Sequence, residues 1–157
     1  FYIQAYKSIE LGVNLNPDQQ IFHYDDYALY HLLDVAAGQT DLISFCHPAV
    51  FQLLNYDEKN NSDYAYSLYI YLCSGCNLVK AAKAFNIHRN SMEYRITKTQ
   101  EILNINLSDP EVILNLNSSF KILQFREGVN FKKLLKNLVH PEQQFRTTGN
   151  IPSSHLI

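Results

Sequence analysis

One stretch, residues 77–98, constrains the fold of this chain more than any other, because it carries two short helical patterns with almost nothing between them. The first pattern places small and apolar side chains on one helix face: Leu78, Ala81, Ala82 and Phe85. Asn77 precedes it as a good N-cap, and Asn86 follows it as a residue that tolerates the left-handed conformation in which many helices end. We therefore expect a short helix from Leu78 to Phe85.

A second helix is expected to begin at His88 and to extend towards Leu103, with its apolar face on Met92, Ile96 and Thr99. The small side chains of the first helix allow another backbone to approach closely. Two helices that cross steeply over a turn of about three or four residues need such an approach. The spacing is typical of a helix-turn-helix.

The distribution of charge supports this interpretation. The chain has a formal net charge of −2, which argues against a generally basic coat for nucleic acid. Residues 78–100 nevertheless contain five basic side chains and one acidic side chain, a net +4, so the remaining residues sum to −6. Phosphate would attract the first region and repel the second, and the helix pair should therefore turn towards DNA.

The rest of the chain predicts a mainly α, multi-helix fold, with one short strand possible near residues 20–24. Asp25 or Asp26 is expected to cap a helix that runs to Ala37, and Ser62 or Asp63 to cap a later one. Residues 56–61 look like a polar connection. A helix over residues 2–11 is expected to carry Tyr2, Tyr6 and Ile9 on one face and to stop at Gly12. Ser108-Asp109-Pro110-Glu111 is expected to start a later helix as a capping box with Pro110 in the first turn. The other expected helices are one opened by Thr40-Asp41, one over residues 48–54 and one over residues 130–139.

Length and composition limit the class of protein. The chain starts at Phe1 without a leader pattern, and we expect it to be a piece of a longer protein. No apolar run approaches the ~18 residues that a membrane span needs, so no membrane association is predicted. Three cysteines in 157 residues do not make a disulfide framework, which favours reduced thiols and a cytoplasmic protein.

The run Ala-Ala-x-x-Phe-x-Ile-His-Arg-Asn-Ser-x-x-Tyr-Arg-Ile, residues 81–96, resembles the C-terminal DNA-binding domain of PucR/CdaR-type transcriptional regulators, whose pattern is close to A-A-x-x-L-x-[IV]-H-x-N-T-[LV]-x-Y-R-[IL]. Phe85, Ser91 and Met92 depart from that pattern but keep its polarity. The resemblance covers residues 46–123 well and residues 1–45 more weakly.

The resemblance implies a division into three parts. Residues 1–45 would be a connector and the end of an upstream GGDEF-like regulatory region, residues 46–125 the helix-turn-helix domain, and residues 126–157 a C-terminal extension. It also implies a sequence-specific bacterial transcription factor, controlling metabolite-utilisation genes, that binds double-stranded DNA as a homodimer. A small-molecule effector, if any, would bind the upstream domain, and no cofactor is expected.

A recognition helix needs long or small polar side chains in its first two turns, because these turns enter the major groove. We expect Arg89 and Asn90 to reach base edges, and Ser91, Lys98 and Lys80 to contact phosphate. The full set of predicted DNA-binding residues is Asn77, Lys80, His88, Arg89, Asn90, Ser91, Tyr94, Arg95 and Lys98.

Several of these residues have a structural alternative. His88 or Ser91 could cap the second helix, and Arg95 could pair with an acidic side chain and hold two helices together. Four tyrosines surround one helix and could form either a dimer contact or an amphipathic surface: Tyr64, Tyr66, Tyr69 and Tyr71.

No catalytic constellation is present, and no enzyme activity is predicted. Cys73-Ser74-Gly75-Cys76 has redox spacing but follows a helix instead of opening one, which favours accidental thiols. A zinc site from Cys46, His47, Cys73 and Cys76 would lack a second tight ligand pair, and no metal is predicted. The alternative function is an interaction or oligomerisation module whose helix-turn-helix no longer binds DNA.

Overall fold

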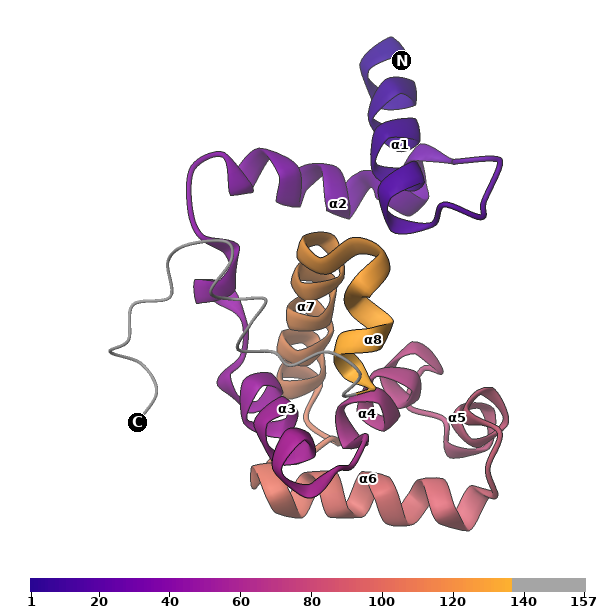
Figure 1. Ribbon diagram of the computed structural model, residues 1–157, viewed down its shortest axis with the longest axis vertical. Coiled ribbons are helices and arrows are strands. Elements are labelled where there is room, and N and C mark those ends of the chain that lie inside the picture. The colour runs from indigo at the N-terminus through magenta and orange to yellow at the C-terminus, as the bar shows by residue number, and fades with distance from the viewer. Residues whose placement is uncertain (137–157) are drawn as a thin grey trace.

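The computed structural model describes residues 1–136, and every regular element in this part of the chain is helical, which confirms the mainly α prediction. The helices follow one another in Figure 1 as α1 (Tyr2–Leu15), α2 (Tyr24–Ala37), the 3-10 helix η1 (Leu42–Phe45), α3 (Pro48–Asn60), α4 (Tyr64–Cys73), α5 (Leu78–Phe85), α6 (Arg89–Leu103), α7 (Pro110–Glu127), the 3-10 helix η2 (Gly128–Asn130) and α8 (Phe131–Leu135).

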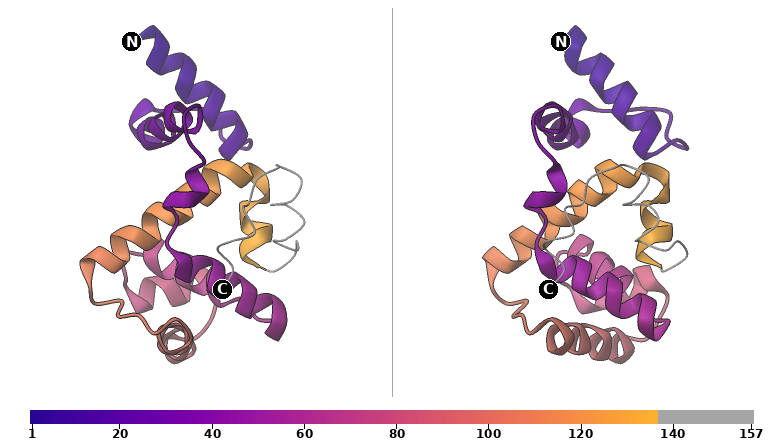
Figure 2. Two further views of the ribbon diagram at one scale, coloured as in Figure 1. Left: turned by 90° about the vertical axis from the view of Figure 1, so that its left-hand side faces the viewer. Right: turned by 60° about the vertical axis from the view of Figure 1, so that its left-hand side comes forward.

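The helices form a large body with a smaller pair at one end. Helices α3 to α6 lie together, and α7 rises from them towards α1 and α2 at the opposite end (Figures 1 and 2). Helix α6 runs along the edge of the molecule that is farthest from α1 (Figure 1). This position leaves one long side of α6 open to solvent.

The main core fills the space between α3, α4, α6 and α7. Leu53, Leu68, Met92, Leu116 and Leu123 are all fully buried there. Helix α8 packs against the same core through three side chains, Phe131, Leu134 and Leu135. Since each helix offers one apolar face to a shared centre, the hydrophobic effect holds this body together as one unit.

A smaller apolar cluster joins α1 to α2. Leu11, Leu15, Tyr27 and Tyr30 form it, and Phe125 from the far end of α7 packs against it. The Tyr30 hydroxyl also donates a 2.7 Å hydrogen bond to Gln124 Oε1 on α7. Helix α7 therefore connects the two cores.

The N-terminal segment corrects three predictions. Gly12 does not stop α1; it lies inside the helix, where a Cβ would overlap the ring of Phe22. The possible strand at residues 20–24 is wrong, because within residues 1–136 no strand exists for it to pair with, and α2 already begins at Tyr24. Asp25 and Asp26 do not cap α2, because they lie in its first turn, one and two residues beyond its start. Their negative charges there interact favourably with the positive end of the helix dipole.

The predicted polar connection at residues 56–61 is also wrong, since α3 continues through it to Asn60. Asp57 on α3 is 1% exposed and accepts hydrogen bonds from Ser62 Oγ (2.6 Å), Tyr64 N (2.9 Å) and Ala65 N (2.7 Å). It thereby satisfies free N–H groups at the start of α4. Asp63 occupies the predicted N-cap position, but its side chain makes no capping hydrogen bond, and Asp57 accepts in its place. Burial raises the pKa of Asp57, against the opposing effect of these hydrogen bonds.

The C-terminal helix α8 starts at Phe131 and ends at Leu135. The last residues of the helix predicted over 130–139, and the tail that follows, lie outside the described residues. Helix α7 begins with Pro110 in the first turn, as predicted, but its N-cap is Asp109, which accepts from Glu111 N at 2.9 Å, and not Ser108 as a capping box requires.

Candidate nucleic-acid interface

Helix α5 forms as the sequence predicts. The Asn77 side chain accepts a 3.0 Å hydrogen bond from Lys80 N, and Asn86 ends the helix in the left-handed conformation with φ 62°. Ala81 and Ala82 are buried against the neighbouring helices. Local caps at both ends therefore define an eight-residue helix, and its small residues allow close packing.

Helix α6 begins at Arg89 and presents its predicted apolar face inward. Met92, Ile96 and Thr99 are buried, together with Leu103 at the end of the helix. His88 occupies the N-cap position, but its side chain makes no capping hydrogen bond, which contradicts the capping alternative for this residue. The opposite face of the first two turns is consequently left to polar side chains.

Most of the predicted site residues are exposed, and one of them is turned towards α4. Arg89, Asn90, Ser91 and Tyr94 are exposed on the first two turns of α6, and His88 is exposed at the N-cap position before them. Asn77 and Lys80 are exposed at the start of α5, and Lys98 is half-buried one turn beyond Tyr94. Arg95 instead points towards α4.

Acidic side chains partly neutralise the basic residues of α6. Arg89 Nη1 lies 2.9 Å from Glu93 Oε2, and about half of each side chain is exposed. Lys98 Nζ lies 3.1 Å from Glu101 Oε2, and this hydrogen bond raises the pKa of Lys98. Solvent screens such pairs, so a phosphate or a base can replace the carboxylate as the partner.

Arg95 is held by groups on and beside α4. Its Nη1 atom donates to Asp63 Oδ1 at 2.6 Å and to Ser67 Oγ at 2.9 Å. The guanidinium carbon lies 5.6 Å from the ring centre of Tyr64 and 5.0 Å from that of Phe85. The cation therefore has two aromatic neighbours within the distance of a cation–π contact.

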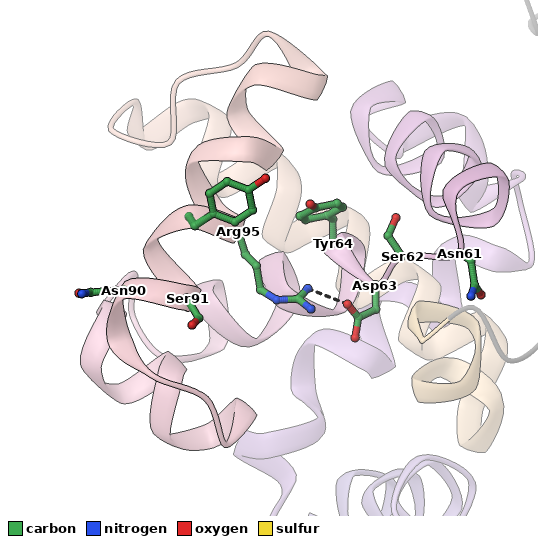
Figure 3. A pocket seen from close by; sticks show the side chains of 8 residues that line it. Asn61, Ser62, Asp63, Tyr64, Asn90, Ser91 and Arg95 are labelled. Carbon is green, nitrogen blue, oxygen red and sulfur yellow. Dashed lines mark hydrogen bonds and ion pairs between the residues drawn. The ribbon is translucent and has the colours of Figure 1, made fainter.

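An open cleft of about 540 Å³ separates the start of α4 from the start of α6. Figure 3 shows Arg95 extending from α6 towards Asp63, with Tyr64 beside the pair and the Asn90 side chain pointing away from it. Four of the lining residues were predicted site residues, namely Asn90, Ser91, Tyr94 and Arg95. The others were missed, because only the folded chain brings them close: Asn61, Ser62, Asp63 and Tyr64.

The cysteines do not assemble a centre. Burial raises the pKa of Cys46 to about 11 and also raises that of Cys76. His47 uses Nδ1 to accept from Ala49 N and so caps α3. Within residues 1–136, no three His, Cys, Asp or Glu side chains are grouped so that they could hold a metal ion, and the zinc arrangement considered for Cys46, His47, Cys73 and Cys76 is not formed.

The tyrosines of α4 are half-buried by this chain itself. Tyr64 packs on Tyr56, Tyr66 on Phe85, and Tyr69 on both Phe120 and Phe131. These contacts lie within the chain, and all four tyrosines are only partly buried by them. Separately, none of the helices in residues 1–136 is long and apolar enough to cross a membrane.

The arrangement of α4, α5 and α6 defines a helix-turn-helix module. Residues 64–122 match the family described as the PucR C-terminal helix-turn-helix domain, and this part of the chain is a domain of that type. No solved structure gives a significant match.

Three curated proteins of Bacillus subtilis (strain 168) are similar to the chain. The purine catabolism regulatory protein is 30% identical, over 66% of this chain and 19% of its own length. The proline-responsive transcriptional activator PutR is 26% identical, over 69% of this chain and 26% of its own length. The DNA-binding transcriptional activator AdeR is 25% identical, over 66% of this chain and 23% of its own length. The chain thus spans about a quarter or less of these relatives.

Proposed function

We propose that this chain is the DNA-binding part of a transcriptional regulator and that the first two turns of α6 enter the major groove. One observation carries the proposal: Arg89, Asn90, Ser91 and Tyr94 are exposed on those turns, beside the exposed Glu93, while the opposite face of the same helix is packed in the main core. A rigid helix with a free polar face is what base readout requires.

The roles of individual side chains follow from their positions. Arg89 can donate twice to guanine, and Asn90 can pair with adenine. Ser91 and Lys98 lie on α6 and Lys80 is exposed on α5, and all three suit phosphate contacts. Other contacts are assigned to Asn77 and His88 near the helix starts and to Tyr94, which is 63% exposed.

The names of the relatives support a finer proposal. One is a purine catabolism regulator and another a proline-responsive activator, so we propose that this chain too controls genes for the use of a metabolite. It would act in the cytoplasm as a homodimer on two half-sites, with any effector bound by a region preceding residues 1–45. Residues 46–125 would form the DNA-binding unit.

Affinity for DNA at two salt concentrations tests the proposal. Genomic fragments selected by the chain should be bound strongly at about 50 mM salt and far more weakly at about 200 mM, because several phosphates would be neutralised. Circular dichroism should confirm that the chain stays folded under both conditions. A folded chain that binds no DNA even at low salt would contradict the proposal and favour the protein-interaction module.

The substitution Arg89→Ala tests base readout. We expect it to reduce discrimination between a selected site and unrelated DNA by about 1–3 kcal/mol, with little change in stability because Arg89 is exposed. Lys133→Ala, an exposed basic residue on α8, is the matched control and should leave discrimination unchanged. If Arg89→Ala unfolds the domain, or lowers affinity equally for all sequences, its assigned role is wrong.

A further inference from the structure

Arg95 differs from Arg89 and Lys98 because its carboxylate partner lies outside α6 and because its ion pair is less exposed than theirs. Only 27% of its side chain is exposed, and Asp63 and Ser67 accept its hydrogen bonds at 2.6 and 2.9 Å. A phosphate that approached Arg95 would also approach the carboxylate of Asp63. The position therefore suits a link between helices better than a contact with DNA.

Both ends of this link are anchored to buried groups. Ser67 is fully buried on α4, and Asp57 fixes the start of the same helix through its three hydrogen bonds. On α6, the fully buried Thr99 donates a 2.8 Å hydrogen bond to the carbonyl oxygen of Arg95. Movement of α6 relative to α4 must therefore break the Arg95 contacts.

We infer that Arg95 is a positioning residue, which acts through Asp63 and Ser67 to set the angle at which α6 presents Asn90, Ser91 and Tyr94 to DNA. The inference rests on the proposed function and deepens it. Arg95 thus leaves the set of predicted DNA-contacting residues, and Asp63 joins the site although it is acidic and lies 32 residues away in the chain.

Two substitutions that each remove a charge distinguish a positioning role of Arg95 from a direct contact with DNA. If Arg95 positions α6, then both Arg95→Gln and Asp63→Asn should weaken binding to a selected DNA site, roughly tenfold each, and the double variant should be no weaker than either single variant. If Arg95 contacts phosphate, Asp63→Asn should strengthen binding, because it removes a negative charge beside the DNA.

Two further variants sharpen the test. Arg95→Lys keeps the charge but loses the planar, stacked geometry, so it should fail to restore binding; a phosphate contact would be largely restored. Lys80→Gln, a matched charge change at an exposed position, should lower the slope of log affinity against log salt by about 1, whereas Arg95→Gln should leave the slope unchanged.

A measurement without DNA completes the design. In amide NMR spectra, Asp63→Asn should shift the resonances of residues 88–95, since α6 changes its position. Asp63 is 36% exposed, so this variant is expected to fold even if Arg95→Gln does not. Unchanged α6 resonances, or stronger DNA binding by Asp63→Asn, would overturn the inference. Failure of the wild-type chain to bind DNA would contradict the proposed function and the inference together.

Discussion

The helix-turn-helix body and the α1–α2 pair bury their apolar side chains to different extents. In the body, α3, α4, α6 and α7 each turn one apolar face into a shared core. Helices α1 and α2 share only a small cluster and leave a second set of large apolar side chains exposed: Tyr2, Ile3, Tyr6, Ile9, Val13, Leu29, Leu32 and Val35.

This difference shows what periodicity can and cannot decide. Helix α1 carries two apolar stripes, one through Leu11 and Leu15 and one through Tyr6, Ile9 and Val13. The expected helix was found, but the face that its pattern emphasised is exposed, and the face with Leu11 and Leu15 is buried. We therefore expect most of the stability to reside in the body, where apolar side chains from several helices share one buried core.

The largest loss of stability is expected from Asp57→Ala in the body. It would remove the acceptor for two backbone N–H groups at the start of α4, and each unsatisfied buried donor costs about 1–3 kcal/mol. The free energy of unfolding, measured with urea, should fall by about 2–6 kcal/mol.

Asp109→Ala is the matched control, because Asp109 also caps a helix but is exposed and accepts one backbone hydrogen bond in the cap. Its expected cost is about 1 kcal/mol. Equal losses for the two variants would show that the buried carboxylate has no special role.

A pair of leucine truncations compares the two regions directly. Leu68→Ala empties a fully buried position in the body and should cost about 2–5 kcal/mol of global stability. Leu15→Ala, in the small cluster, should mainly release α1 and α2. Amide hydrogen exchange should then quicken in α1 and α2 and stay slow in α4 and α6. Equal loss of protection in α4 would mean that the two regions unfold as one.

The smallest effect is expected at Cys46, which lies between the two regions in a cluster with Leu42 and Ile122. Burial raises its pKa to about 11, so the neutral thiol stabilises the fold below its ordinary pKa of 9.0, and this contribution is lost as the pH rises through 11. At pH 8, a thiol reagent should modify the exposed Cys73 quickly and Cys46 slowly. Rapid labelling of Cys46 would mean that the junction opens readily.

The sequence was sufficient to predict those helix ends and helix faces that are determined by neighbouring residues. Asn77 and Asn86 bound α5, and Pro110 lies in the first turn of α7, because the start and end of a helix depend on neighbouring residues. The exposed residues of α6 were also predictable, since Met92, Ile96 and Thr99 mark the opposite face. The strand near residues 20–24 was not excluded by its pattern, because short apolar runs suit several structures.

The sequence by itself determined a helix-turn-helix with a polar, basic face, because helical periodicity and end caps are properties of adjacent residues. Only the tertiary structure decided that Asp57 caps α4, that Asp63 and Ser67 hold Arg95, and which stripe of α1 is buried. Each of these depends on which distant groups the packed helices bring within contact distance, and the spacing of residues along the sequence does not specify those contacts.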